Sequence, residues 1–128
     1  MKKGATLISL IVVVLIIVLL IVFLNIKPKE FVLEEGVPIP EELCSKLPDY
    51  FAISQPGCPH CAIVMPRLKE LENELSIIIK YYDLSINENR AELTNAGVYP
   101  KGVPTVVINC EVFVGEKSKE FFREKLLL

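Results

Sequence analysis

The fold is decided by a short stretch, Gly57-Cys58-Pro59-His60-Cys61, which follows the apolar run Phe51-Ala52-Ile53-Ser54. Cysteines three residues apart on a helix lie about 5–6 Å from each other, within the reach of a disulfide bond. Pro59 suits the first position of a helix, which makes Cys58 the N-cap. The free N–H groups and the dipole at that helix end favour an ionised sulfur, and a charge on His60 would add to the effect. A reactive thiolate beside a second thiol is the arrangement that thiol–disulfide exchange needs.

Two other interpretations of Cys58 and Cys61 stay open. A Cys-x-x-Cys pair is half of many zinc sites, but zinc needs two further ligands. The remaining cysteines, Cys44 and Cys110, lie far apart in the sequence, and the one histidine, His60, lies inside the motif. The pair could also be a purely structural cross-link. We expect redox chemistry with no metal and no cofactor, since the sequence has no nucleotide, flavin or haem motif.

The N-terminal part of the chain predicts a membrane anchor. Residues 5–24 form an uncharged run dominated by Ile, Leu and Val, and a helix of about 20 residues spans the hydrocarbon core of a bilayer. A cleaved signal peptide has an apolar region of about 7–15 residues and a small-residue cleavage site, which Phe23-Leu24-Asn25-Ile26-Lys27 lacks. We therefore expect residues 1–26 to be a cytoplasmic tip and a transmembrane signal anchor. Lysines flank the run on both sides, so charge leans only slightly towards a cytoplasmic N-terminus.

The remainder of the chain is long enough for one small domain. Three prolines and mixed charge predict a stem or linker over residues 27–40, with a short edge strand at 31–33, and a folded domain over residues 41–128. All 16 acidic residues follow residue 26, and only Lys2 and Lys3 of the 14 basic residues precede it, so this part has a net charge of −4. It contains no run of Lys or Arg, and nucleic acid binding therefore has no support.

Hydrophobic periodicity predicts the order of elements in the domain. A short helix over 41–47 and a strand over 49–54 precede a helix over 59–75, whose apolar residues recur every three or four positions. Pro66 either bends this helix or divides it in two. A strand over 77–83, a helix over 87–95 capped by Ser85 or Asn87, and a loop over 99–102 follow. Strands over 106–108 and 112–114, joined by a three-residue turn, precede a final helix from the cap Ser118 to about residue 126.

This order, β-α-β-α-β-β-α with Cys-x-x-Cys at the start of the first helix, resembles the thioredoxin-like fold over about residues 49–126. Pro66 stands five residues after Cys61, where thioredoxins carry a helix-kinking proline, and Val103-Pro104-Thr105 is similar to the family's cis-proline signature. The resemblance implies an α/β fold with a four-stranded mixed sheet of order 2-1-3-4. It also implies that Pro104 is cis and faces the two cysteines, in a loop that presents backbone groups of Val103 and Thr105 to a substrate chain. An ordinary trans proline at the start of a strand is the alternative.

The residues between the cysteines refine the resemblance. Pro59-His60 is more similar to the dipeptide of the periplasmic oxidase DsbA than to the Gly-Pro of thioredoxin, and such a histidine stabilises the thiolate and makes the disulfide more oxidising. Alternatively, His60 is an exposed polar residue without effect. Ala52 stands where thioredoxins have a buried acid, which argues against an efficient reductase.

A closer resemblance is to the thioredoxin-like domains that pair with vitamin K epoxide reductase homologues. Those domains often carry Cys-Pro-His-Cys together with a stretch similar to Gly102-Val103-Pro104-Thr105-Val106-Val107-Ile108-Asn109. The resemblance implies a membrane quinone reductase of this type as the partner that reoxidises the cysteines.

The resemblance also has a consequence for Cys44 and Cys110. In a thioredoxin-like fold the strand at 49–54 starts at the end of the sheet opposite the motif, and the antiparallel strand at 106–108 ends there. This implies a structural disulfide between Cys44 and Cys110, with two reduced thiols as the alternative. Four cysteines in two pairs fit an oxidising compartment, so we expect the domain outside the cytoplasm and the N-terminus inside.

Together these observations predict a membrane-anchored thiol–disulfide oxidoreductase with Cys58 as the nucleophile and Cys61 as its redox partner. Its substrates would be protein clients, and we expect it to act as an oxidase or isomerase. A tethered reductase, for example in cytochrome c maturation, and a tethered binding module without enzymatic activity are the alternatives.

Overall fold

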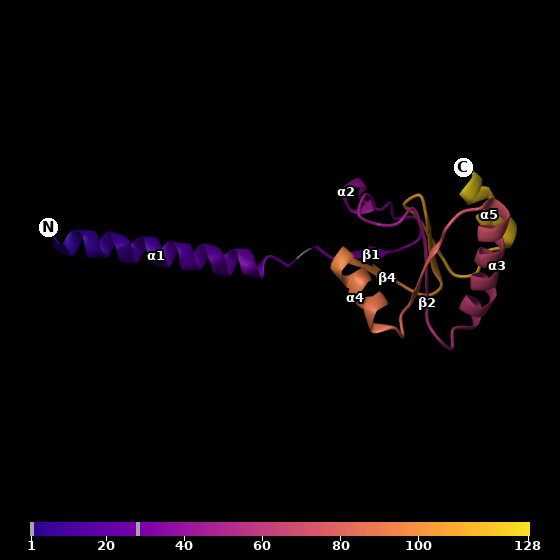
Figure 1. Cartoon of the computed structure of the whole chain (residues 1–128), viewed down its shortest axis with the longest axis horizontal. Coiled ribbons are helices and arrows are strands. Elements are labelled where there is room, and N and C mark those ends of the chain that lie inside the picture. The colour runs from indigo at the N-terminus through magenta and orange to yellow at the C-terminus, as the bar shows by residue number, and fades with distance from the viewer. Residues whose placement is uncertain (1, 28) are drawn as a thin grey trace.

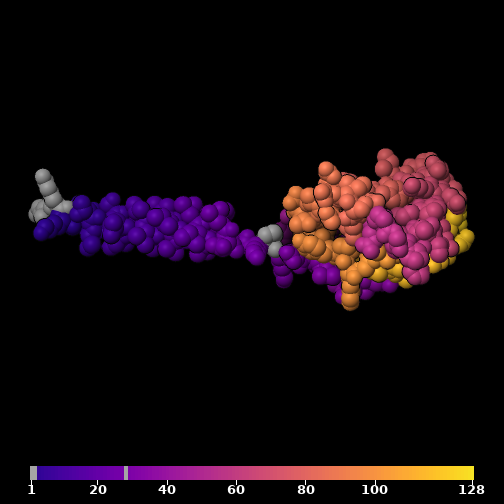
Figure 2. All heavy atoms as spheres, turned by 90° about the horizontal axis from the view of Figure 1, so that it is seen from below, coloured from indigo at the N-terminus to yellow at the C-terminus, as the bar shows by residue number. Residues whose placement is uncertain are grey.

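The computed structural model describes residues 2–27 and 29–128 and begins with a long apolar helix, α1 (Lys2–Asn25). Residues 3–25 of this helix are exposed, and the helix appears as a rod apart from the folded body (Figures 1 and 2). The segment Lys3–Leu24 has a mean hydropathy of 3.8 and is long and apolar enough to cross a membrane. Such a surface is not stable in water, so α1 is a candidate for a single membrane span or a signal anchor.

A four-stranded mixed sheet forms the centre of the domain. It contains β2 (Tyr50–Ser54), β3 (Lys80–Asp83), β5 (Thr105–Ile108) and β6 (Glu111–Val114) in the order β3-β2-β5-β6. β3 runs parallel to β2, whereas β5 is antiparallel to both β2 and β6. The two inner strands are apolar on both sides, because helices or loops cover both faces of the sheet.

Two helices cover one face of the sheet, α3 (Pro59–Leu75) and α5 (Lys119–Leu127) (Figure 1). α3 has the bounds expected from the sequence, and Pro66 lies inside one continuous helix. Its residues Val64, Leu68 and Leu71 are fully buried at the predicted helical spacing. They pack with Phe122 of α5 in a core cluster that also contains residues of the sheet. Ile63 belongs to the same apolar spacing, by which the sequence places it on this buried face, but it is 41% exposed.

The other face carries α4 (Asn87–Ala96), α2 (Glu41–Cys44) and a second, two-stranded sheet of β1 (Phe31–Leu33) and β4 (Val98–Pro100). β1 and β4 are parallel, with Phe31 opposite Val98. Gly97 ends α4 with a φ of 78°, a left-handed conformation that glycine adopts readily, and its carbonyl accepts the Phe31 N–H at 2.8 Å. The turn after α4 is thus hydrogen-bonded to the N-terminal segment of the domain.

The expected stem over 27–40 is wrong for most of its length. Leu33 is fully buried and Ile39 is 7% exposed, and both belong to the core cluster on this face. The expected loop over 99–102 likewise contains the end of β4. The short strand expected at 31–33 is confirmed as β1 (Phe31–Leu33). The sequence did not indicate its partner, because β4 contains Pro100 and becomes a strand only by pairing with β1 across a large sequence separation. The folded body therefore starts at Phe31 rather than at residue 41.

Three smaller expectations also need correction. Residues 77–79 lie outside β3, and Ile78 is 87% exposed. The N-cap of α4 is Ile86, whose side chain makes no capping bond, while Ser85 donates its hydroxyl to Asp83. The turn between β5 and β6 has two residues, Asn109 and Cys110, with φ of 48° and 66°. Positive φ at both positions is the geometry of a tight two-residue hairpin.

Candidate active site at Cys58 and Cys61

Local backbone geometry places the two cysteines where β2 passes into α3. β2 ends at Ser54, Gly57 turns the chain with a φ of 76°, and Cys58 is the N-cap of α3 in an extended conformation. Pro59 occupies the first helical position, where a missing N–H costs no hydrogen bond. The Cys61 N–H donates to the Cys58 sulfur at 3.1 Å. A negative charge that develops on Cys58 therefore meets a backbone donor and the positive end of the helix dipole.

Cys58 and Cys61 form a disulfide with a Cα–Cα distance of 5.2 Å. The two sulfurs differ in access, because Cys58 is half-buried whereas Cys61 is only 4% exposed. An incoming thiolate reaches Cys58 more easily than Cys61. This difference favours attack on the Cys58 sulfur over attack on the Cys61 sulfur.

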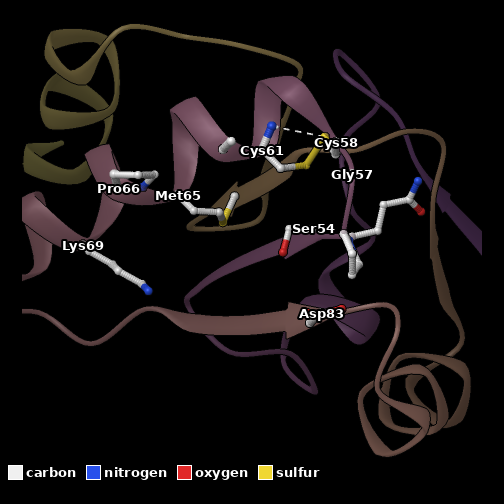
Figure 3. A pocket seen from close by; sticks show the side chains of 11 residues that line it. Ser54, Gly57, Cys58, Cys61, Met65, Pro66, Lys69 and Asp83 are labelled. Atoms are coloured by element: carbon white, nitrogen blue, oxygen red, sulfur yellow. Dashed lines mark hydrogen bonds between the residues drawn. A yellow bond between two sulfur atoms is a disulfide. The ribbon is translucent and has the colours of Figure 1, made fainter.

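The surroundings of Cys61 contain no buried acid among the described residues. Ala52 is fully buried, and Thr105 is the only buried polar residue among residues 3–27 and 29–128. A cavity of about 410 Å³ instead opens beside the disulfide, where Ser54, Met65, Lys69 and Asp83 lie around the two cysteines (Figure 3). Hydrogen bonds from the Ser85 hydroxyl and N–H lower the pKa of Asp83, which is therefore a carboxylate at neutral pH. Cys61 and the Asp83 carboxylate thus line the same cavity.

Pro104 lies at the same end of the sheet as the disulfide. Thr105 pairs with Ile53, so the preceding Val103-Pro104 bond, which is cis, lies level with the end of β2. The Pro104 carbonyl accepts the Gly115 N–H at 2.9 Å, which links this loop to the segment after β6. Val103 is partly exposed, but Thr105 is fully buried with its hydroxyl bonded to the Gly102 carbonyl. The Thr105 side chain is thus not available to a substrate.

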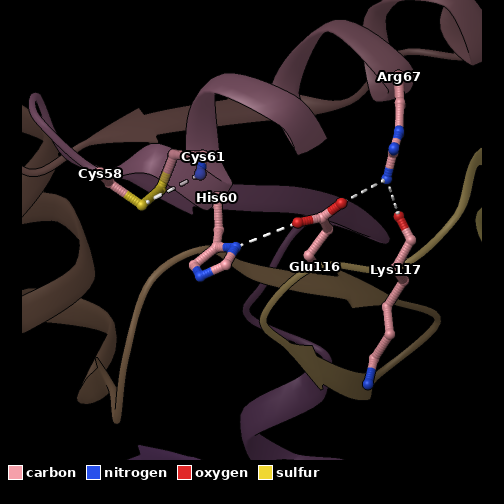
Figure 4. Close-up of polar contacts among 6 residues, drawn as sticks. All are labelled: Cys58, His60, Cys61, Arg67, Glu116 and Lys117. Carbon is pink, nitrogen blue, oxygen red and sulfur yellow. Dashed lines mark hydrogen bonds and ion pairs between the residues drawn. A yellow bond between two sulfur atoms is a disulfide. The ribbon is translucent and has the colours of Figure 1, made fainter.

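His60 lies beside the disulfide and contacts a residue that the sequence analysis did not single out. The side chain of His60 is 63% exposed, and its Nδ1 lies 3.1 Å from Oε2 of Glu116 (Figure 4). The other oxygen of Glu116 lies 3.4 Å from Arg67, which also donates to the Lys117 carbonyl at 2.8 Å. Glu116 is 56 residues from His60 and stands in a charged stretch without any motif. No local signal in the sequence marks it.

The second cysteine pair lies at the opposite end of the sheet. Cys44, the last residue of α2, forms a disulfide with Cys110 in the β5–β6 turn, at a Cα–Cα distance of 5.8 Å. The segment before β2 is thereby tied to the end of the sheet remote from Cys58. In the described part of the chain no group of three or more His, Cys, Asp or Glu side chains could hold a metal ion.

Comparison with known proteins assigns the family. No family model matches the chain. A thioredoxin of Methanocaldococcus jannaschii is 31% identical over 74 residues, which is 57% of this chain and 85% of that thioredoxin. On this similarity, the chain belongs to the thioredoxin family. The Cys-x-x-Cys pair at the start of α3 and the mixed sheet agree with the assignment.

Two solved structures are similar to parts of the chain. The crystal structure of a mutant of the thioredoxin-like protein BC3987 is 28% identical, covers 63% of this chain and 97% of its own, and has a TM-score of 0.43. The solution structure of a thioredoxin-like protein from Clostridium perfringens is 17% identical, covers 77% and 80% of the two chains, and has a TM-score of 0.47. Both TM-scores are below 0.5, so the family assignment rests on the sequence relative.

Proposed function

We propose that this protein is a thiol–disulfide oxidoreductase, anchored in a membrane by α1, that exchanges disulfides with protein clients outside the cytoplasm. The observation that carries the proposal is the placement of the Cys58–Cys61 disulfide at the N-terminus of α3. There the more accessible sulfur accepts a backbone N–H, and its partner is buried behind it. A purely structural cross-link needs neither a more accessible sulfur nor a backbone donor directed at it.

In the oxidising direction a client thiolate attacks the Cys58 sulfur. The bond between Cys58 and Cys61 breaks, and Cys61 leaves as a thiolate that takes up a proton. A second client thiolate then attacks the client sulfur of the mixed disulfide, and Cys58 leaves as a thiolate stabilised by the helix N-terminus. The client loses two electrons and gains a disulfide, while the protein becomes a dithiol. In the reducing direction the steps are reversed, and Cys61 resolves the mixed disulfide.

The residues around the cysteines favour oxidase or isomerase activity. The reduced form gains stability from every group that favours the Cys58 thiolate, and His60 and the α3 N-terminus are such groups. Ala52 leaves Cys61 without a buried base that would speed its attack on a mixed disulfide. Val103, which is partly exposed, would line the groove for the client chain next to Cys58, and the buried Pro104 would shape the loop beneath it. A tethered reductase is the main alternative, and a binding module with an inert disulfide is the second.

An oxidase needs a partner that takes up its electrons. We propose a membrane quinone reductase of the vitamin K epoxide reductase type, since α1 would keep the domain close to a partner in the same bilayer. Only residues 26–30 separate α1 from β1, which limits the distance between the domain and the membrane surface to about 17 Å of extended chain. The Cys44–Cys110 disulfide is consistent with an oxidising compartment.

Trapping of mixed disulfides tests the proposal. In full-length Cys61→Ala the intermediate on Cys58 cannot be resolved from within, so client proteins should stay attached through Cys58 on a non-reducing gel. Cys58→Ala is the matched control, and it should trap far less because Cys61 is buried. If Cys61→Ala captures neither a client nor a membrane partner, the enzymatic proposal is wrong and the binding module is favoured.

Two further measurements separate the alternatives within the proposal. The equilibrium of the Cys58–Cys61 pair with glutathione gives the reduction potential, and a value near that of thioredoxin, about −270 mV, would favour the reductase. A membrane-impermeant maleimide added to intact cells should label reduced Cys58 in the Cys61→Ala variant. Labelling that appears only after lysis would place the domain in the cytoplasm.

A further inference from the structure

His60 is positioned by a residue from a distant loop rather than by its own helix. Its Nδ1 lies 3.1 Å from Oε2 of Glu116, in the segment that follows β6 (Figure 4). We infer that Glu116 is a positioning residue that holds the His60 ring beside the N-terminus of α3 and thereby sets the redox equilibrium of the Cys58–Cys61 pair. This inference rests on the proposed function and adds to it the group that regulates the same site.

Glu116 is itself held in place from several sides. Its neighbour Gly115 donates its N–H to the Pro104 carbonyl, and Ser118 caps α5 by accepting the Phe121 N–H. Both ends of this short loop are therefore held by hydrogen bonds. Arg67 contacts the second oxygen of Glu116 and donates to the Lys117 carbonyl at 2.8 Å. Glu116 consequently offers His60 a fixed acceptor rather than a mobile side chain.

The charges of this cluster indicate how Glu116 acts. A carboxylate accepts hydrogen bonds, so Nδ1 of His60 is the donor, and no described residue forms a hydrogen bond with Nε2. The guanidinium of Arg67 lies 3.4 Å from Glu116 and opposes the charge of the carboxylate, which reduces the direct field of Glu116 at Cys58. The effect of Glu116 on the sulfur therefore passes through the position of the His60 ring. Without this contact a ring that is 63% exposed would spend much of its time in solvent, away from Cys58.

This mechanism and a direct charge effect predict opposite signs. If Glu116 acts by positioning, Glu116→Ala releases the ring, the Cys58 thiolate loses stabilisation, and the protein becomes a weaker oxidant. If Glu116 acted only through its own charge, the same substitution would leave Arg67 uncompensated, favour the thiolate and make the protein a stronger oxidant.

A double-mutant cycle in the full-length protein in detergent micelles tests the inference. The equilibrium constant of the Cys58–Cys61 pair with glutathione is measured for the wild type, Glu116→Ala, His60→Ala and the double variant. We expect Glu116→Ala to shift this constant by about threefold or more towards the oxidised protein, and by less than about 1.5-fold when His60 is already alanine. Equal shifts in both backgrounds, or a shift of Glu116→Ala towards the reduced protein, would overturn the inference.

The single histidine of the chain supplies a second readout. In the ¹⁵N spectrum, wild-type His60 should show Nδ1 as the protonated, hydrogen-bonded nitrogen, and Glu116→Ala should lose this signature. Glu116→Gln keeps an oxygen that can accept from Nδ1, so it should retain the signature. Its equilibrium constant should lie between those of the wild type and Glu116→Ala. Glu124→Ala, which removes an exposed carboxylate of α5, is the matched charge control and should leave both readouts unchanged. An unchanged spectrum in Glu116→Ala would also overturn the inference.

These measurements do not depend on any client. Failure to trap clients with Cys61→Ala would contradict the proposed function, while the glutathione equilibrium and the His60 spectrum would still report whether Glu116 positions the ring. The two failures are therefore distinguishable.

Discussion

Removal of the Cys44–Cys110 disulfide should destabilise the domain strongly, although it lies at the end of the sheet remote from the active site. The bond joins residues 66 positions apart, so the loop that it closes contains β2, α3, β3, α4, β4 and β5. In the chain-entropy model, cross-linking a loop of this length removes freedom from the unfolded chain equivalent to about 4 kcal/mol. The double variant Cys44→Ala/Cys110→Ala should lose this amount of unfolding free energy.

The measurement is urea unfolding followed by far-ultraviolet circular dichroism, with the helical signal of α1 in micelles as a constant background. Both proteins keep the Cys58–Cys61 disulfide, which cross-links only a short loop. With an m value of about 1.5 kcal/mol/M, a loss of about 4 kcal/mol moves the midpoint by about 3 M urea. The double substitution avoids a lone free thiol, which could pair with Cys58.

Loss of packing must be separated from loss of the cross-link, because Cys44 and Cys110 also contact the core cluster around Leu33 and Val112. In a Cys58→Ala/Cys61→Ala background, chemical reduction opens the remaining disulfide without removing any sulfur atom. Reduction should lower the unfolding free energy by most of the amount that the Cys44→Ala/Cys110→Ala variant loses. A loss below about 1 kcal/mol in both experiments would refute the argument from loop length, because the segment would then be held by its other contacts alone.

Two further predictions concern the boundary of the domain and its behaviour in alkali. Leu33→Ala should cost about 2–5 kcal/mol of unfolding free energy because Leu33 is fully buried. Val32→Ala, at a position 49% exposed, should change it by about 0.5 kcal/mol or less. If urea unfolding shows equally small losses of unfolding free energy for both variants, residues 31–33 would belong to a stem rather than to the folded domain. Burial and a hydrogen bond to Glu72 raise the pKa of Tyr81 above its ordinary value of 10.0. Above pH 10 the unfolded chain gives up a proton that the folded chain keeps, so stability should fall with rising pH. The stability of Tyr81→Phe should fall less steeply over the same pH range. If the stabilities of the wild type and the variant decline in parallel, the raised pKa of Tyr81 is contradicted.

Several parts of the site could be predicted because they depend on residues close together in the sequence. The bounds of α3 follow from Pro59 at its start and from apolar residues at helical spacing, and the N-cap role of Cys58 follows from the same proline. An apolar run that ends before Pro56 and Gly57 likewise predicts the buried strand β2. In these segments, local backbone preference and the final fold agree.

Other parts depended on contacts that no local pattern encodes. The sequence indicated a short strand at 31–33 but not its partner β4, and the two strands are held in place by each other and by the buried Leu33. The pairing of Cys44 with Cys110 could be inferred only through a resemblance that placed both at one end of the sheet. The contact of Glu116 with His60 was not foreseen at all, because a glutamate in a charged stretch looks like an ordinary surface residue.

By itself, therefore, the sequence determined the apolar helix α1, the two cysteines on one helical turn and the alternation of strands and helices around them. These features follow from spacing, proline positions and hydrophobic periodicity, which act over a few residues. The tertiary structure alone decided where the domain begins and which loop faces His60. These features depend on free energies of burial and pairing between segments brought together only when the whole domain folds.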